Sequence, residues 1–318
     1  MPEYPDIVVY IEALEKRILG RELERVQIAS PFLLRTAVPT ISSVAGKKVL
    51  ELRRLGKRIC IGVEDGLWLV LHLMIAGRLH WKDSKAKSSK RDLAAFEFEN
   101  GRLSLTEAGS QRRASLHLVE GETALRNLDP GGLDVFELKD HTIFAAALQS
   151  ENHTLKRALT NPRLFSGIGN AYSDEILFAA QLSPVRLTQK LTPDELERLY
   201  SATRTTLTQW VERLREETEL SFPEGVTAFR EDMAVHGRYK QPCPRCSAKI
   251  QRIRYASNET NYCPGCQTAE SCSLTVLSRA SCVRIGREWQ KNKERQGFAE
   301  PRGYCLSYGQ WRQPLSQQ

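Results

Sequence analysis

Apolar residues near the start of the chain recur at helical spacing, at intervals of four, three and four residues: Ile7, Ile11, Leu14 and Ile18. This spacing places side chains on one face of an α-helix. Pro5 and Asp6 suit a first helical turn, and Gly20 suits a stop. The pattern therefore predicts one amphipathic helix over residues 4–20.

From residue 21 to about residue 119 the period of the apolar positions changes to two, which indicates short strands. Two turn signals predict hairpins. Asp65-Gly66 separates residues 59–64 from 67–73, and Asn100-Gly101 separates residues 94–99 from 102–106. Residues 82–92 are polar and predict a long exposed loop. Regular short strands of this kind favour a β-sandwich or a barrel.

A proline and glycine turn at residues 128–132 marks the best domain boundary, and helical patterns follow it. Thr192, Pro193 and Glu195 predict the capped start of a long helix. Its apolar face is formed by Leu196, Leu199, Thr203, Leu207, Trp210, Val211 and Leu214. The second half of the chain is therefore expected to be largely helical.

The 318 residues and 41% hydrophobic content are those of a globular chain of about two domains. A formal net charge of +8 favours an anionic partner modestly. No apolar run reaches the ~20 residues that span a bilayer, and no secretory leader opens the chain. We therefore expect a cytoplasmic protein, nucleoid-associated if bacterial, with no membrane contact.

The eight cysteines include two CxxC pairs separated by 16 residues, namely Cys243, Cys246, Cys263 and Cys266. This spacing favours one structural zinc ion held by four thiolates, with two disulfides or unrelated thiols as the alternatives. Residues 238–254, which start before the first CxxC pair and continue into the segment between the two pairs, are strongly basic. A hairpin formed by this segment is a candidate phosphate-binding arm. Cys60 is expected in a strand core, and the remaining cysteines have no ligand-like spacing: Cys272, Cys282 and Cys305.

Pro2 follows the initiator Met1, and removal of Met1 would leave a free secondary amine. Such an amine attacks an aldehyde-level carbon and forms an iminium, which is an electron sink. The adjacent Glu3 could move protons. An ordinary N-terminus remains the alternative, because proline at position two is common.

Five motifs occur in one order along residues 1–266: residues 1–6 (MPEYPD), 54–57 (RLGK), 72–77 (HLMIAG), 165–175 (FSGIGNAYSDE) and the four-cysteine finger after residues 235–238 (VHGR). In this order they resemble the formamidopyrimidine-DNA glycosylase and endonuclease VIII family. The resemblance implies an α+β fold: an N-terminal β-sandwich with an N-terminal helix, then a helix–two-turn–helix domain and a C-terminal zinc finger. The implied limits are 1–130, 131–235 and 236–267. The basic tail at residues 268–318 lies outside the resemblance, and either disorder or nonspecific binding of DNA is expected for it.

The resemblance also implies a bifunctional DNA glycosylase and AP lyase of base excision repair. It would act as a monomer on damaged double-stranded DNA, with one structural zinc ion. The implied catalytic residues are Pro2, Glu3 and Lys57. The implied DNA-binding residues are His72, Ile75, Arg112, Arg113, Lys156, Asn170, Arg252, Arg254 and Asn258, and Glu175 matches a family glutamate.

The sequence departs from the formamidopyrimidine branch at four places. Asn258 stands where that branch has an arginine at the hairpin tip, and Ile75 stands at the position of a base-stack methionine. Residues 110–114 contain no phenylalanine, and only residues 222–235 remain for a lid segment. These differences weigh against 8-oxoguanine as the main substrate. A DNA-binding protein without catalysis and, more remotely, a zinc-ribbon RNA-associated factor stay as alternative functions.

Overall fold

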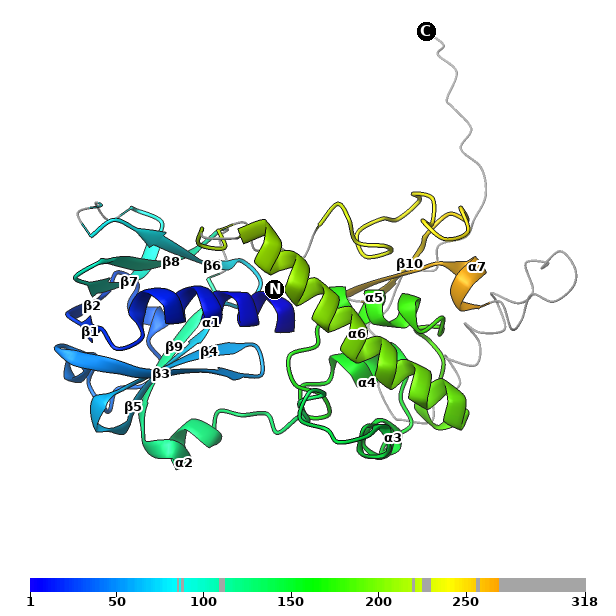
Figure 1. Cartoon of the computed structure of the whole chain (residues 1–318), viewed down its shortest axis with the longest axis horizontal. Coiled ribbons are helices and arrows are strands. Elements are labelled where there is room, and N and C mark those ends of the chain that lie inside the picture. Colours follow the sequence, from blue (N-terminus) through cyan, green and yellow to red (C-terminus); the bar gives the residue numbers. More distant parts are fainter. Residues whose placement is uncertain are drawn as a thin grey trace, which may run out of the picture. The chain divides into compact units, whose positions relative to one another are not determined.

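The computed structural model describes residues 1–84, 86, 89–108, 112–218, 221–224, 230–255 and 258–268 (Figure 1). Several sequence predictions lie outside these residues. They are the tail after Thr268 with its three cysteines, part of the loop at residues 110–114, part of the lid segment, and the hairpin tip at residues 256–257.

Two antiparallel sheets form the N-terminal part, as the sequence predicted (Figure 1). The first sheet has the order β1-β3-β4-β5-β9, with strands Glu22–Leu23, Lys47–Leu55, Arg58–Val63, Leu67–His72 and Ser115–Glu120. The second has the order β2-β7-β8-β6, with strands Arg25–Ile28, Asp92–Phe98, Gly101–Glu107 and Gly77–Lys82.

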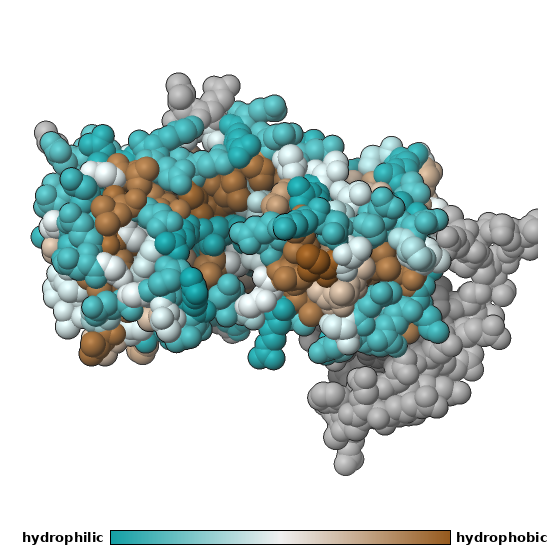
Figure 2. Space-filling model, turned by 60° about the horizontal axis from the view of Figure 1, so that its bottom comes forward, coloured by the Kyte–Doolittle hydropathy of each residue, from teal (hydrophilic) through white to brown (hydrophobic). Residues whose placement is uncertain are grey.

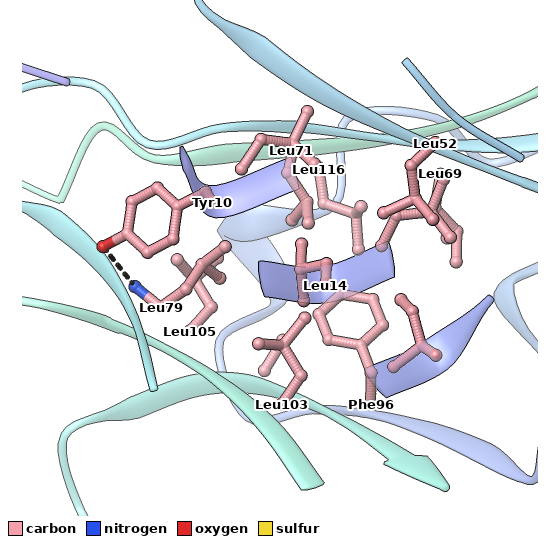
Figure 3. Packing of buried hydrophobic residues seen from close by; sticks show 14 of the residues in the cluster. Tyr10, Leu14, Leu52, Leu69, Leu71, Leu79, Phe96, Leu103, Leu105 and Leu116 are labelled. Carbon is pink, nitrogen blue, oxygen red and sulfur yellow. Dashed lines mark hydrogen bonds between the residues drawn. The ribbon is translucent and has the colours of Figure 1, made fainter. Parts of the chain in front are cut away.

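Helix α1 (Tyr4–Ile18) contributes its apolar face to the core between these sheets (Figure 3). Tyr10 and Leu14 are fully buried there, and the Tyr10 hydroxyl accepts a hydrogen bond from the Leu79 backbone over 3.4 Å. The helix ends two residues before the predicted stop. Gly20 lies beyond it with a φ of +73°, and its N–H donates to the Val49 carbonyl.

One hairpin turn differs from the sequence prediction. Phe98 pairs with Gly101, so the loop between β7 and β8 consists of Glu99 and Asn100. Gly101 therefore belongs to the strand. It packs so closely against Trp81 that an added Cβ would lie 2.4 Å from the indole ring. This glycine therefore permits close packing instead of forming the turn.

The helical region contains α2 (Gly121–Arg126), α3 (His141–Gln149), α4 (Leu155–Thr160), α5 (Asn170–Ala179) and α6 (Pro193–Thr218). The predicted start of α6 is confirmed, since the Thr192 hydroxyl accepts from the Glu195 N–H and the Glu195 carboxylate accepts from the Thr192 N–H. The seven predicted face residues of α6 are all buried. Val211 and Leu214 pack against Val9 of α1.

The finger consists of β10 (Gln251–Tyr255), β11 (Asn258–Tyr262) and α7 (Pro264–Gln267). Its small core of Val235, Ile250 and two cysteines includes Phe178 of α5. Polar residues dominate the face in Figure 2, with apolar patches between them. Among the described residues, no helix combines the length and apolarity that crossing a lipid bilayer requires.

Candidate active site

The carboxylate of Glu3 lies at the N-terminus of α5. It accepts hydrogen bonds from the backbone N–H groups of Gly169 (2.7 Å), Ala171 (2.9 Å) and Tyr172 (3.2 Å). The first N–H groups of a helix have no partner within the helix and attract negative charge. Glu3 is therefore the anion at this helix start, and a phosphate could take these three donors only by displacing it.

Gly169 makes this approach possible. It is the N-cap of α5, and a Cβ there would lie 2.4 Å from Cδ of Glu3 and 2.6 Å from Nζ of Lys57. Nearby, the Tyr4 N–H donates to the Gly167 carbonyl over 2.9 Å. The start of α1 is thereby held against the loop before α5, and Asn170 is the first residue of α5 instead of its N-cap.

The N-terminus is enclosed at the same place. Pro2 and Glu3 are both buried. Burial lowers the pKa of the Met1 amino group, with an opposing effect from Glu3 and a further lowering from Arg78. The amino group is therefore partly desolvated and within the electrostatic influence of Glu3.

Lys57 lies in the two-residue turn between β3 and β4. Burial lowers the pKa of its ammonium group, Glu3 raises that pKa and Lys156 lowers it. Lys156 itself donates to the carboxylate of Asp174 and to the carbonyl of Asn170, each over 2.6 Å. Lys156 thus supports the first turn of α5, and only one of its three N–H donors remains for a phosphate.

The two arginines that precede Lys57 in the sequence both have carboxylate partners within the protein. Arg53 pairs with Glu51 and Glu122. Arg54 pairs with Asp134, donates to the Ser166 hydroxyl and lies over the Tyr4 ring. The role of Arg54 was missed, because its partners are 80 and 112 residues away in sequence.

The other predicted DNA-binding residues of the N-terminal part lie at the ends of strands. His72 ends β5, and burial together with Arg58, Lys57 and His117 lowers its pKa to about 4. Ile75 is in the loop that follows, with 61% of its surface exposed. Arg112 and Arg113 are exposed just before β9.

The sequence analysis also missed Asp174, which joins α5 to the finger. Its fully buried carboxylate accepts from Lys156, from Nδ1 of His236 (2.8 Å) and from the Asn261 N–H (3.0 Å). The neighbouring Glu175 accepts from three successive backbone N–H groups, those of Ala234, Val235 and His236. A buried Asp-Glu pair beside a helix start was the available signal.

The basic hairpin of the finger is partly neutralised. The carboxylate of Glu259 accepts from Arg252 (3.1 Å) and Arg254 (3.3 Å), and the Arg252 guanidinium lies 4.2 Å from the Tyr239 ring centroid. Asn258 is exposed at the start of β11. The hairpin therefore keeps less free charge than its sequence suggests.

The four predicted metal ligands converge. The sulfur atoms of Cys243, Cys246, Cys263 and Cys266 lie within 4.8 Å of one another. Tetrahedral thiolates with metal bonds of about 2.3 Å need sulfur separations of about 3.8 Å, and the 3.3 Å and 3.9 Å separations here bracket that value. These four thiolates fit one zinc ion. With four protein ligands the site is structural, because it leaves no coordination position for a substrate.

Three family models match successive parts of the chain. Residues 1–114 match the formamidopyrimidine-DNA glycosylase N-terminal domain, residues 132–221 match its H2TH domain, and residues 240–269 match a zinc finger found in FPG and IleRS. A formamidopyrimidine-DNA glycosylase of Laribacter hongkongensis is 32% identical, with 84% of this chain and 100% of the relative covered. The chain belongs to the formamidopyrimidine-DNA glycosylase family.

A second member of the formamidopyrimidine-DNA glycosylase family, from Pelotomaculum thermopropionicum, is 29% identical over 84% of this chain and 99% of its own length. Lactococcus lactis Fpg, solved with abasic-site DNA, has the same fold with a TM-score of 0.75 and 24% identity, covering 83% of this chain and 99% of that one. The predicted α+β architecture and the zinc finger are thereby confirmed.

Proposed function

We propose that this protein is a bifunctional DNA glycosylase and AP lyase of base excision repair. One chain acts on one damaged duplex in the cytoplasm, removes oxidised or ring-opened bases, and cuts the abasic strand by β- or β,δ-elimination through a Schiff base on Pro2. Family membership supports the glycosylase step. The observation that carries the rest is the buried N-terminus beside a Glu3 carboxylate that α5 fixes in place.

The chemistry follows from a free Pro2 amine. Its nitrogen bonds to C1′ of the damaged nucleoside, the bond from C1′ to the base breaks, and the base leaves with a proton. Opening of the sugar gives an iminium, which acidifies the C2′ proton. Loss of that proton expels the 3′ phosphate and cuts the strand. Glu3 carries protons between these positions, and Lys57 binds the phosphate that flanks the lesion.

Borohydride trapping on duplex DNA with one abasic site tests this proposal. We expect a covalent adduct with the processed chain and strand cleavage without borohydride. Pro2→Gly should lose most of the adduct. A chain that carries one extra residue before Pro2 is the matched control, since it keeps every side chain but blocks the amine, and it should form no adduct.

The main alternative is a damaged-DNA-binding protein without catalysis, which the altered residues at Ile75 and Asn258 would permit. It predicts tight binding to abasic duplex without an adduct or a cut. Preference for structured RNA over damaged duplex would instead support an RNA-associated factor. A cleavage panel of formamidopyrimidine, 8-oxoguanine, oxidised pyrimidine and abasic duplexes identifies the preferred lesion.

A further inference from the structure

A row of basic residues crosses the outer face of the five-stranded sheet, starting beside the candidate active site. Arg58 pairs with His72 across β4 and β5, and His72 pairs with Ser115 of β9. His117 is two residues beyond Ser115, so it shares their face of the sheet. Leu116 lies between Ser115 and His117, and Leu118 follows His117. Both leucines are buried in the core on the opposite face of the sheet.

The row continues past the edge of the sheet. The N–H of Arg35 donates to the Leu116 carbonyl over 2.8 Å, and Leu34 forms a parallel bridge with Leu116. Leu34 packs against the core, so alternation along this segment directs Arg35 to the same side as His117. Three strand separations of about 4.8 Å place Arg58 and Arg35 about 14 Å apart.

Arg35 and Arg58 differ from their neighbours in having no internal counter-charge. On the same hairpin as Arg58, the arginines at 53 and 54 have carboxylate partners. Among the described residues, no carboxylate lies within ion-pair distance of Arg35, Lys57 or Arg58. Nδ1 of His117 is buried, and it has no hydrogen-bond partner among the described residues.

The electrostatic environment of the two histidines agrees with this. Burial is the largest cause of the lowered pKa of His117, and Arg58 and Arg35 lower it further. Burial is also the largest cause for His72, and Arg58, Lys57 and His117 add to its effect. All the charged groups that influence either ring are basic. A surface with cations brought together and no acid among them is repulsive until an anion binds.

We propose that Arg58, His72, His117 and Arg35 continue the Lys57 site as a phosphate track that binds the DNA backbone flanking the lesion. This rests on the proposed function, because it takes damaged duplex as the ligand. At about 3.4 Å of axial rise per nucleotide, a 14 Å row reaches across about four nucleotides of one strand. Contacts with phosphates carry no sequence information, so the row adds affinity for the flank without sequence preference.

The salt dependence of binding to an abasic duplex tests the track. Each phosphate contact contributes about 0.9 to the slope of log K against log salt. The variant R35Q/R58Q should therefore lower the slope by about 1.8, so that between 50 and 200 mM salt it loses about tenfold less affinity than the wild type. The control K90Q/R91Q removes two exposed charges before β7 and should keep the wild-type slope.

Two further measurements restrict the interpretation. H117R should steepen the slope by about 0.9, since it adds a permanent charge to the track. On a duplex of the same length in which neutral methylphosphonates replace the four phosphates on each side of the abasic site, R35Q/R58Q and the wild type should have equal slopes. Thermal unfolding of each variant checks that the fold is intact.

An unchanged slope for R35Q/R58Q on the unmodified duplex overturns the track and leaves the glycosylase proposal standing, and so does a slope difference that persists on the methylphosphonate duplex. An equal loss in K90Q/R91Q overturns it also, since the effect would then come from net charge. A wild-type chain that binds no abasic duplex overturns both proposals together.

Discussion

The backbone N–H of Gly169 donates a 2.7 Å hydrogen bond to the carboxylate of Glu3, across 166 residues of sequence. This contact joins the N-terminal sandwich to the first turn of α5. It fixes the carboxylate beside the N-terminus without using another side chain. The position of Glu3 therefore depends on backbone groups of the helical region, which few substitutions can alter.

Gly169→Ala should slow the lyase reaction strongly while leaving the fold largely intact. The backbone φ of −132° accepts any residue, but the new Cβ would lie 2.5 Å from Oε1 of Glu3 and 2.6 Å from Nζ of Lys57. Both side chains must move. A displacement of this size at reacting groups costs about 100-fold in rate, which trapping kinetics on abasic duplex would measure.

Gly121→Ala is the comparison variant for that experiment. Its φ of +81° gives backbone strain, yet no heavy atom lies within 4 Å of the added Cβ. It should lose about 1 kcal/mol of stability and keep its trapping rate. Equal losses of trapping in both variants would mean that strain, and not the displacement of Glu3, controls the reaction.

The sequence predicted local elements well because their causes are local. Helical spacing over Ile7 to Ile18, the cap at Thr192 and the two CxxC pairs each depend on residues close together in the chain. The structure bears out the helix, the capping and the convergence of the cysteines. The errors, at Gly20 and Gly101, came from packing against residues elsewhere.

Contacts between distant segments could not be predicted in this way. The pairing of Arg54 with Asp134 and the three donors on Asp174 join segments that only the complete fold brings together. For the same reason the sequence could not show that Glu3 is the anion at the start of α5. A helix N-terminus predicts an anion, but not which one.

Asp174→Asn should destabilise the joint between α5 and the finger. The carboxylate of Asp174 accepts from two cationic or potentially cationic side chains and one N–H, and an amide would replace one acceptor oxygen with a donor. Breaking a buried pair of this kind costs about 3–5 kcal/mol. Urea unfolding measures the loss. Glu216→Gln, an exposed change on α6, should stay within about 0.5 kcal/mol of the wild type.

The stability of the protein should fall between about pH 4 and pH 6 because of Asp6. Burial raises the pKa of Asp6 from 3.8 to about 6, so the folded state holds this proton more tightly than the unfolded chain. The resulting stabilisation is complete below pH 4 and is lost as the pH rises through 6. Linkage gives about 1.4 kcal/mol per pH unit within that window.

Asp6→Asn removes this titration but keeps an oxygen that can accept from the Glu3 N–H, as Asp6 does over 2.8 Å. The variant should therefore show a flatter stability profile and gain roughly 3 kcal/mol at pH 7. Denaturant unfolding at each pH measures both. If the variant retained the wild-type decline between pH 4 and pH 6, another group would be responsible for it.

Ile75→Ala should weaken binding to abasic duplex without affecting folding. Ile75 is 61% exposed in the loop after β5, so truncation costs within about 0.5 kcal/mol of stability. If its side chain fills the gap left by a flipped nucleotide, the lost burial weakens DNA affinity about tenfold. Leu50→Ala is the matched control, because Leu50 is similarly exposed (57%) on β3. Both variants are titrated with abasic and with undamaged duplexes. If Ile75 fills the gap, Ile75→Ala should weaken only the abasic complex. Equal weakening by both variants would contradict this role for Ile75.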